Sequence, residues 1–107
     1  MPSRTLPALT GASCVLLATG RTLTATLHLE DDALVVHLIE PAGLTRHAWP
    51  QTVVLDAMLE PGVTQVVADV AVHVDETTGD VLVTLDGADG DDVLAVPAGA
   101  VRSALTH

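Results

Sequence analysis

The chain has almost no aromatic side chains: Trp49 stands alone, and there is no Phe or Tyr among the 107 residues. Apolar residues still make up 49 % of the chain, which excludes an intrinsically disordered protein. The core must therefore be built from Val, Leu and Ala, whose small side chains favour burying further apolar surface against copies of the chain. We expect a single domain over residues 1–107, with residues 1–12 as a flexible N-terminus, in a homo-oligomer.

Positive charge is also scarce. There is no Lys, and four Arg stand against 14 acidic residues, so the net charge is −10 at neutral pH. The negative charge lies mostly in the second half, because the formal charges of residues 1–53 sum to −1 and those of residues 54–107 sum to −9. This charge repels phosphate backbones, and the scattered Arg residues make no compact basic patch, so direct binding of nucleic acid is excluded. The remaining explanations are solubility, which we favour, a basic partner, or DNA mimicry.

The chain contains a single cysteine, Cys14. It cannot form an internal disulfide, so a cytoplasmic location is the default, and the residue type favours a small buried side chain over a reactive thiol. No apolar run reaches the length of a membrane span, and we expect no membrane insertion. Residues 6–18 loosely resemble a signal peptide, but Pro, Thr, Gly and Ser interrupt them, so export is the weaker alternative.

Strict alternation of apolar and polar residues predicts a hairpin in the first half. Placing Asp31 and Asp32 at its tip sets Leu29 against Leu34, and puts His28 and His37 on a diagonal of the opposite face. A short helix is predicted at residues 53–60, between Pro50 and the Pro-Gly pair that follows it; the alternative is that residues 52–55 extend a strand. The predicted strands of this half are residues 13–18, 22–29, 34–40 and 44–49.

The last third predicts a three-stranded meander followed by a helix that Pro97 opens. With a turn at residues 76–79, Val74 faces Val81 and Val72 faces Val83; the next turn then sets Val83 against Leu94. Every register that buries the valines leaves the acids outside. The predicted fold class is α+β and mostly β, a twisted antiparallel sheet with a short central helix and a short C-terminal helix. The acids at its turns form the candidate interaction surface: Asp75, Glu76, Asp80, Asp89, Asp91 and Asp92.

Catalytic and metal-binding patterns are weak. Residues 86–92 have the acid and glycine of a calcium loop but not the EF-hand spacing, and hairpin turns favour the same residues. His28 and His37, with His73 or an acid, are a weak zinc or nickel candidate. The serines at positions 3, 13 and 103 have no glycine elbow and no marked His partner, and no phosphate-binding glycine motif is present. We therefore predict a protein that is not an enzyme and that has no cofactor.

The order of elements resembles the SsgA-like family of sporulation and cell-division regulators of filamentous actinomycetes. The resemblance covers roughly residues 22–105 and rests on a strand that holds Trp49, the Asp56–Leu59 helix, the valine strands after it, and the run from Val93 through Pro97 to the C-terminal helix. The chain departs from the family in having no Phe or Tyr and in having Leu55, not Arg, before the helix Asp.

The resemblance implies a sheet packed on helices, similar to the whirly-type single-stranded nucleic-acid binders, and a trimer. It also implies that the protein acts through contacts with other proteins, bringing FtsZ to future division sites, and that it has no cofactor. The acidic C-terminal half argues against extending the likeness to nucleic-acid binding. A second hypothesis from another class is a structural protein of an actinomycete phage, such as a capsid decoration or tail component, because small acidic Val-rich β-domains share this composition.

Overall fold

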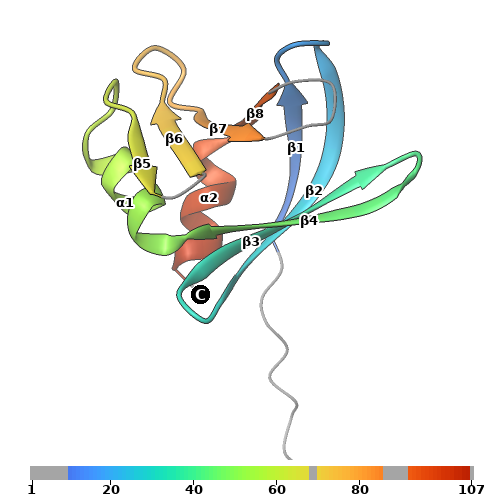
Figure 1. The fold of residues 1–107 in the computed structure, drawn as a ribbon, viewed down its shortest axis with the longest axis horizontal. Helices are drawn as coiled ribbons and strands as arrows, with labels where there is room; N and C mark the ends of the chain where they lie inside the picture. The colour runs from blue at the N-terminus through green and yellow to red at the C-terminus, as the bar shows by residue number, and fades with distance from the viewer. Residues whose placement is uncertain (1–9, 68–69, 86–91, 107) are drawn as a thin grey trace, which may run out of the picture.

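The computed structural model describes residues 10–67, 70–85 and 92–106 (Figure 1). Over these residues the chain forms eight strands and two helices. In chain order they are β1 (Thr10–Leu16), β2 (Arg21–Glu30), β3 (Ala33–Glu40), β4 (Gly43–Pro50), α1 (Gln51–Leu59), β5 (Gln65–Val67), β6 (Val70–Val74), β7 (Val81–Leu85), β8 (Asp92–Val96) and α2 (Ala98–Leu105).

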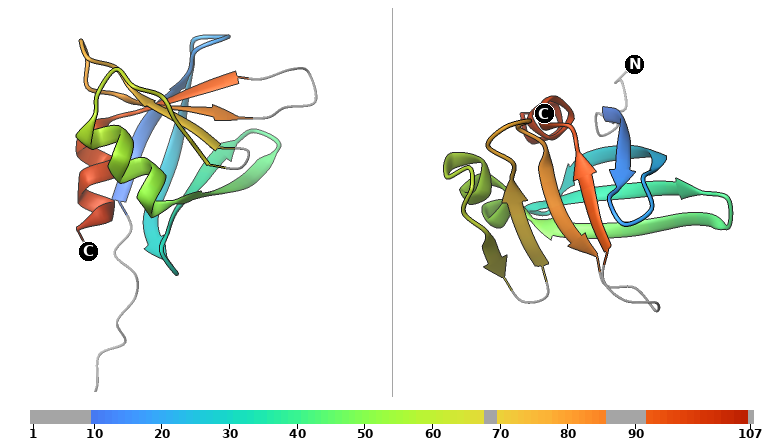
Figure 2. Two further views of the ribbon diagram at one scale, coloured as in Figure 1. Left: turned by 60° about the vertical axis from the view of Figure 1, so that its left-hand side comes forward. Right: turned by 90° about the horizontal axis from the view of Figure 1, so that it is seen from above.

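All eight strands belong to one antiparallel sheet, in the order β4-β3-β2-β1-β8-β7-β6-β5. The predicted fold class is confirmed: the chain is mostly β, with an antiparallel sheet and two short helices. The sheet curls, so that β2–β4 run across the direction of β5–β8 in the right-hand view of Figure 2. The two meanders meet at a seam between β1 and β8, where Val15 pairs with Ala95 and Leu16 with Leu94.

The predicted registers are confirmed. Leu29 pairs with Leu34 across the β2–β3 hairpin. The tip of this hairpin is formed by Asp31, with φ +49°, and Asp32, with φ +66°. Asp tolerates this left-handed backbone better than most residues, and two such residues make the tight turn that suits the twist of a hairpin. In the C-terminal meander, the pairs are Val74 with Val81, Val72 with Val83, and Val83 with Leu94.

Each helix begins immediately after a proline, Pro50 or Pro97, whose φ is −53° or −58°. Proline fixes φ at a value compatible with the start of a helix. Helix α2 packs on β1 and β2 and buries Val101 and Ala104, whereas α1 packs beside β5 and β6. Helix α1 begins at Gln51, two residues before the predicted start, because Pro50 ends β4 and the chain turns directly into the helix.

The core is made of small side chains, as the composition requires. Its largest fully buried members include Leu27, Leu34 and Leu94, surrounded by valines from both meanders. Trp49 is 3 % exposed and belongs to the same cluster, as does Cys14 at 0 %. A single core therefore joins the two halves of the curled sheet.

Strand β1 begins at Thr10, three residues before the predicted start at Ser13. Residues 10–12, which we expected in the flexible N-terminus, pair with residues 25–27 of β2. Gly11 and Ala12 carry little strand propensity of their own, so the long partner strand decides their conformation. Residues 1–9 lie outside the described residues.

Candidate functional site

The predicted acidic surface is only partly brought together. Asp75, Glu76 and Asp80 lie in the turn between β6 and β7, whereas Asp92 begins β8 opposite Leu85, at the other end of β7. A five-residue strand separates those ends by roughly 17 Å. Asp89 and Asp91, like the calcium-loop pattern at residues 86–91, lie outside the described residues.

Two of the turn acids have structural contacts. The Asp75 carboxylate accepts hydrogen bonds from the backbone N–H groups of Thr78, at 3.1 Å, and Thr77, at 2.7 Å, and these bonds lower its pKa. The Glu76 carboxylate occupies the space that a Cβ at Gly62 would take, and Gly62 has a φ of +86°. The Glu76 side chain therefore packs beside the segment that follows α1, and Asp80 is the remaining acid of this turn.

Asp92 holds the seam of the sheet. Its Oδ1 accepts hydrogen bonds from the backbone N–H of Val93, at 2.7 Å, and of Ala18, at 3.1 Å. The N–H of Leu17 donates to the Val93 carbonyl at 2.9 Å beside it. Asp92 thus links the start of β8 to the end of β1, a role that no local sequence pattern indicates.

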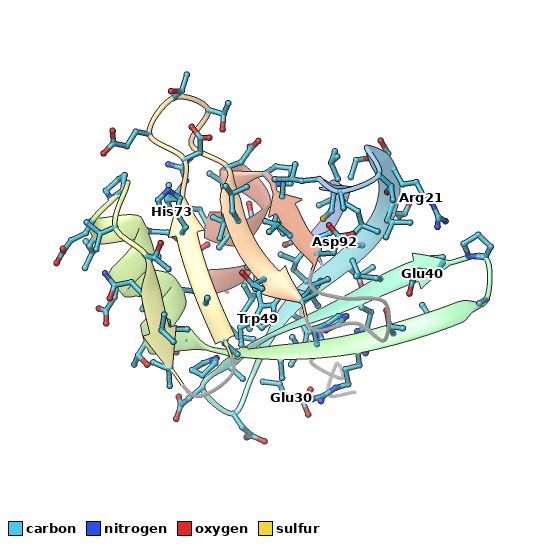
Figure 3. The ribbon with its side chains drawn as sticks, turned by 45° about the horizontal axis from the view of Figure 1, so that its top comes forward. Arg21, Glu30, Glu40, Trp49, His73 and Asp92 are labelled. Atoms are coloured by element: carbon cyan, nitrogen blue, oxygen red, sulfur yellow. The ribbon has the colours of Figure 1, made fainter. Side chains whose placement is uncertain are left out.

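A groove lies between β4 and the strands that cross it, β6–β8. It consists of two adjoining cavities of about 270 and 280 Å³, and the side chains of His47 and Leu85 line both. We call this the β4 groove; Figure 3 shows Trp49, Glu40 and Asp92, which belong to its walls. The full set of lining residues is Leu16, Leu38, Glu40, Thr45, Arg46, His47, Ala48, Trp49, Val70, Thr84, Leu85 and Asp92.

Two carboxylates and one imidazole set the electrostatics of one of the two cavities, whereas the Arg46 guanidinium lines the other. Glu40 and Asp92 line the same cavity as His47, and Thr45 donates its hydroxyl to Glu40 Oε2 at 3.0 Å. Burial lowers the pKa of His47 below its usual 6.5, against a smaller opposing effect of Glu40. At neutral pH the imidazole is therefore uncharged, and this part of the groove has negative charge.

The predicted diagonal of His28 and His37 is confirmed. Their rings are stacked, with centroids 5.8 Å apart and planes 11° apart. His28 Nε2 lies 3.1 Å from Glu30 Oε2, and an Arg46 guanidinium nitrogen lies 3.7 Å from the same oxygen. His73, the suggested third ligand, lies on β6 in the other half of the sheet, with its Nδ1 3.1 Å from the Thr64 hydroxyl. Among the residues that the structure describes, no group of three or more His, Cys, Asp or Glu is placed to hold a metal ion.

Exposed apolar side chains occur along α1, the segment after it and both faces of β5, the strand at one edge of the sheet. Leu59 is 79 % exposed and Val66 is 64 % exposed. We call this the α1–β5 patch, and its members are Leu55, Leu59, Val63, Val66 and Val67. Because an edge strand also offers unpaired backbone groups, this part of the surface is suited to contact with another protein.

The described helices are too short or too polar to cross a membrane. The fold and these surfaces define a small β-rich domain with an open groove, an apolar edge and acidic turns. No family model and no curated protein matches the sequence.

The chain is similar to the solved structure of SsgB of Streptomyces coelicolor, described by the work "Mutations in SsgB correlate to longitudinal cell division during sporulation of Streptomyces coelicolor". The TM-score is 0.73 at 15 % sequence identity, and the match covers 97 % of this chain and 88 % of that one. At this identity the comparison shows a shared fold.

Proposed function

We propose that the chain is a non-enzymatic, cytoplasmic protein-interaction module of the SsgA-like kind, acting in sporulation-specific cell division without a cofactor. The observation that carries the proposal is the structural match to SsgB over 97 % of the chain, because it agrees with the order of elements from the Trp49 strand to the C-terminal helix. The match to a sporulation protein favours this role over the phage structural protein considered from the sequence.

The finer proposal is that the chain recruits or positions the division protein FtsZ. When purified chain is mixed with FtsZ polymerised in GTP and sedimented, we expect it in the pellet in proportion to the polymer. The double variant Glu76→Gln/Asp80→Asn tests the acidic turn and spares Asp75, whose carboxylate holds that turn. We expect the variant to bind at least about threefold more weakly, since it removes two charges at one contact.

The double variant Asp31→Asn/Asp32→Asn is the matched control for FtsZ binding. It makes the same charge change at the β2–β3 turn, and Asn tolerates the left-handed backbone there. Equal weakening by both variants would assign the effect to net charge, and absence of the chain from the FtsZ pellet would reject the FtsZ role.

We also propose that the chain is a homo-oligomer, with a trimer suggested by the resemblance, and that its copies meet at the α1–β5 patch. The exposure of Leu59 at the end of α1 and of Val66 on the edge strand β5 supports this contact. In native mass spectrometry we expect an oligomer for the natural chain and a monomer for Val66→Glu. Leu44→Glu is the control, because Leu44 is 68 % exposed on β4 at the opposite edge of the sheet. A natural chain that is monomeric at micromolar concentration contradicts the proposal.

A further inference from the structure

We propose that the β4 groove is the docking site for an extended segment of a partner protein that carries a basic residue and an apolar residue two positions apart. This inference deepens the proposed function, on which it rests, by naming the chemistry of a partner and the surface that receives it.

The first observation is the position of β4 at the end of the strand order. Within the described ranges, β4 pairs with β3 alone, and its other edge borders the groove. In an antiparallel pair, alternate N–H and C=O groups of an outer strand point away from its partner. The groove therefore has a row of backbone donors and acceptors along one wall, which is the template that strand addition uses.

The second observation is the apolar lining. Leu16, Leu38 and Leu85 line one cavity, and Trp49, Val70 and Leu85 line the adjoining one. Volumes of about 270 and 280 Å³ accept side chains of a single extended segment and are too small for a folded element. An extended segment turns every second side chain to the same side, so residues two positions apart enter the groove together.

The third observation is charge. Glu40 and Asp92 approach the same cavity from β3 and β8, and each carboxylate has one oxygen, Oε2 or Oδ1, engaged within the chain. Their other oxygens can accept hydrogen bonds from Lys or Arg. The net charge of −10 further attracts a cationic segment and repels an acidic one. The site thus selects a basic side chain beside an apolar one.

The test uses defined peptides and the full chain. The probe is an eight-residue peptide in which Thr alternates with Lys and Val, so that Lys and Val lie two positions apart. One comparison peptide has Glu in place of Lys, and another has Gly in place of Val. Binding is followed by amide NMR shifts and by the fluorescence of Trp49, which is the only aromatic fluorophore of the chain.

We expect the Lys–Val peptide to bind saturably, with shifts at Thr45, His47 and Trp49, and both comparison peptides to bind at least about tenfold more weakly. Glu40→Gln should weaken the Lys–Val peptide about tenfold, the effect of losing one charged hydrogen bond. Glu76→Gln makes the same charge change at the β6–β7 turn, so binding should change less than twofold.

Three outcomes would overturn the proposal: equal weakening by Glu40→Gln and Glu76→Gln, equal binding of the Val and Gly peptides, or shifts confined to the α1–β5 patch. The peptide comparisons need no variant, so they decide the question even if Glu40→Gln fails to fold. The titration measures the groove alone, whereas FtsZ sedimentation measures the division role. Failure of one is therefore distinguishable from failure of the other.

Discussion

Replacing Trp49 with Ala should lower the free energy of unfolding by about 3–5 kcal/mol, the usual cost of truncating a buried aromatic side chain. Trp49 is 3 % exposed and is the only aromatic residue in a core of Val, Leu and Ala. Short, β-branched neighbours such as Val53 and Val54 have few rotamers with which to fill the cavity. Since the total free energy of unfolding of a small domain is about 5–15 kcal/mol, the variant should be close to unfolding.

The measurement is urea denaturation followed by far-ultraviolet circular dichroism at one fixed protein concentration, because assembly would add to apparent stability. Leu44→Ala is the matched control on the same strand, where the side chain is 68 % exposed, and it should change stability by less than about 0.5 kcal/mol. A Trp49→Ala variant within 1 kcal/mol of the natural chain would mean that the core relaxes around the loss, contrary to this account.

The second large effect concerns the thiol of Cys14, which should react with iodoacetamide at pH 8 at least about 100-fold more slowly than free cysteine. Burial raises its pKa from 9.0 to about 11, and the side chain is 0 % exposed. Two pKa units reduce the reactive thiolate about 100-fold, and lack of access slows the reaction further. Labelling followed by mass spectrometry, with and without 8 M urea, measures both rates; similar rates in the two conditions would contradict a buried thiol.

The same pKa shift predicts a fall in stability at alkaline pH. Below pH 9 the thiol is neutral in both the folded and unfolded chains; between pH 9 and 11 the unfolded chain ionises and the folded chain does not, so the folded state loses up to about 2–3 kcal/mol. No Lys or Tyr titrates in this range, because the chain has neither. The free energy of unfolding of Cys14→Ala should therefore change little between pH 9 and 11. A fall in stability that persists in this variant would mean that a group other than Cys14 causes it.

Local patterns predicted the hairpins because each hairpin is specified by neighbouring residues. Asp31 and Asp32 mark a tip by their turn propensity, and alternation then sets every pair from Leu29 and Leu34 onward. A shift by one residue would move all the apolar side chains to the solvent face, so a single register satisfies burial. The prolines before α1 and α2 act over the same short range.

The candidate surfaces are formed by contacts between residues that lie far apart in the sequence. Asp92 was assigned to an acidic contact surface along with Asp75, yet it holds the β1–β8 seam through a hydrogen bond from Ala18, 74 positions away. The α1–β5 patch was not predicted either, since exposed valines have the same local pattern as buried ones. Val66 pairs with Ala71 on the edge strand β5, so it lies on the opposite face of the sheet from the buried Val72.

By itself, the amino-acid sequence determined the hairpin registers, the approximate positions of the helices and of every strand but β5, the small-residue core and the acidic character, because each depends on composition or on residues close in the chain. The tertiary structure alone decided that β1 pairs with β8 and that the sheet curls until β4 faces β7. The β4 groove exists because His47 of β4 and Leu85 of β7 line the same two cavities, and the packing of a whole sheet around one core, which no local pattern encodes, brings them together.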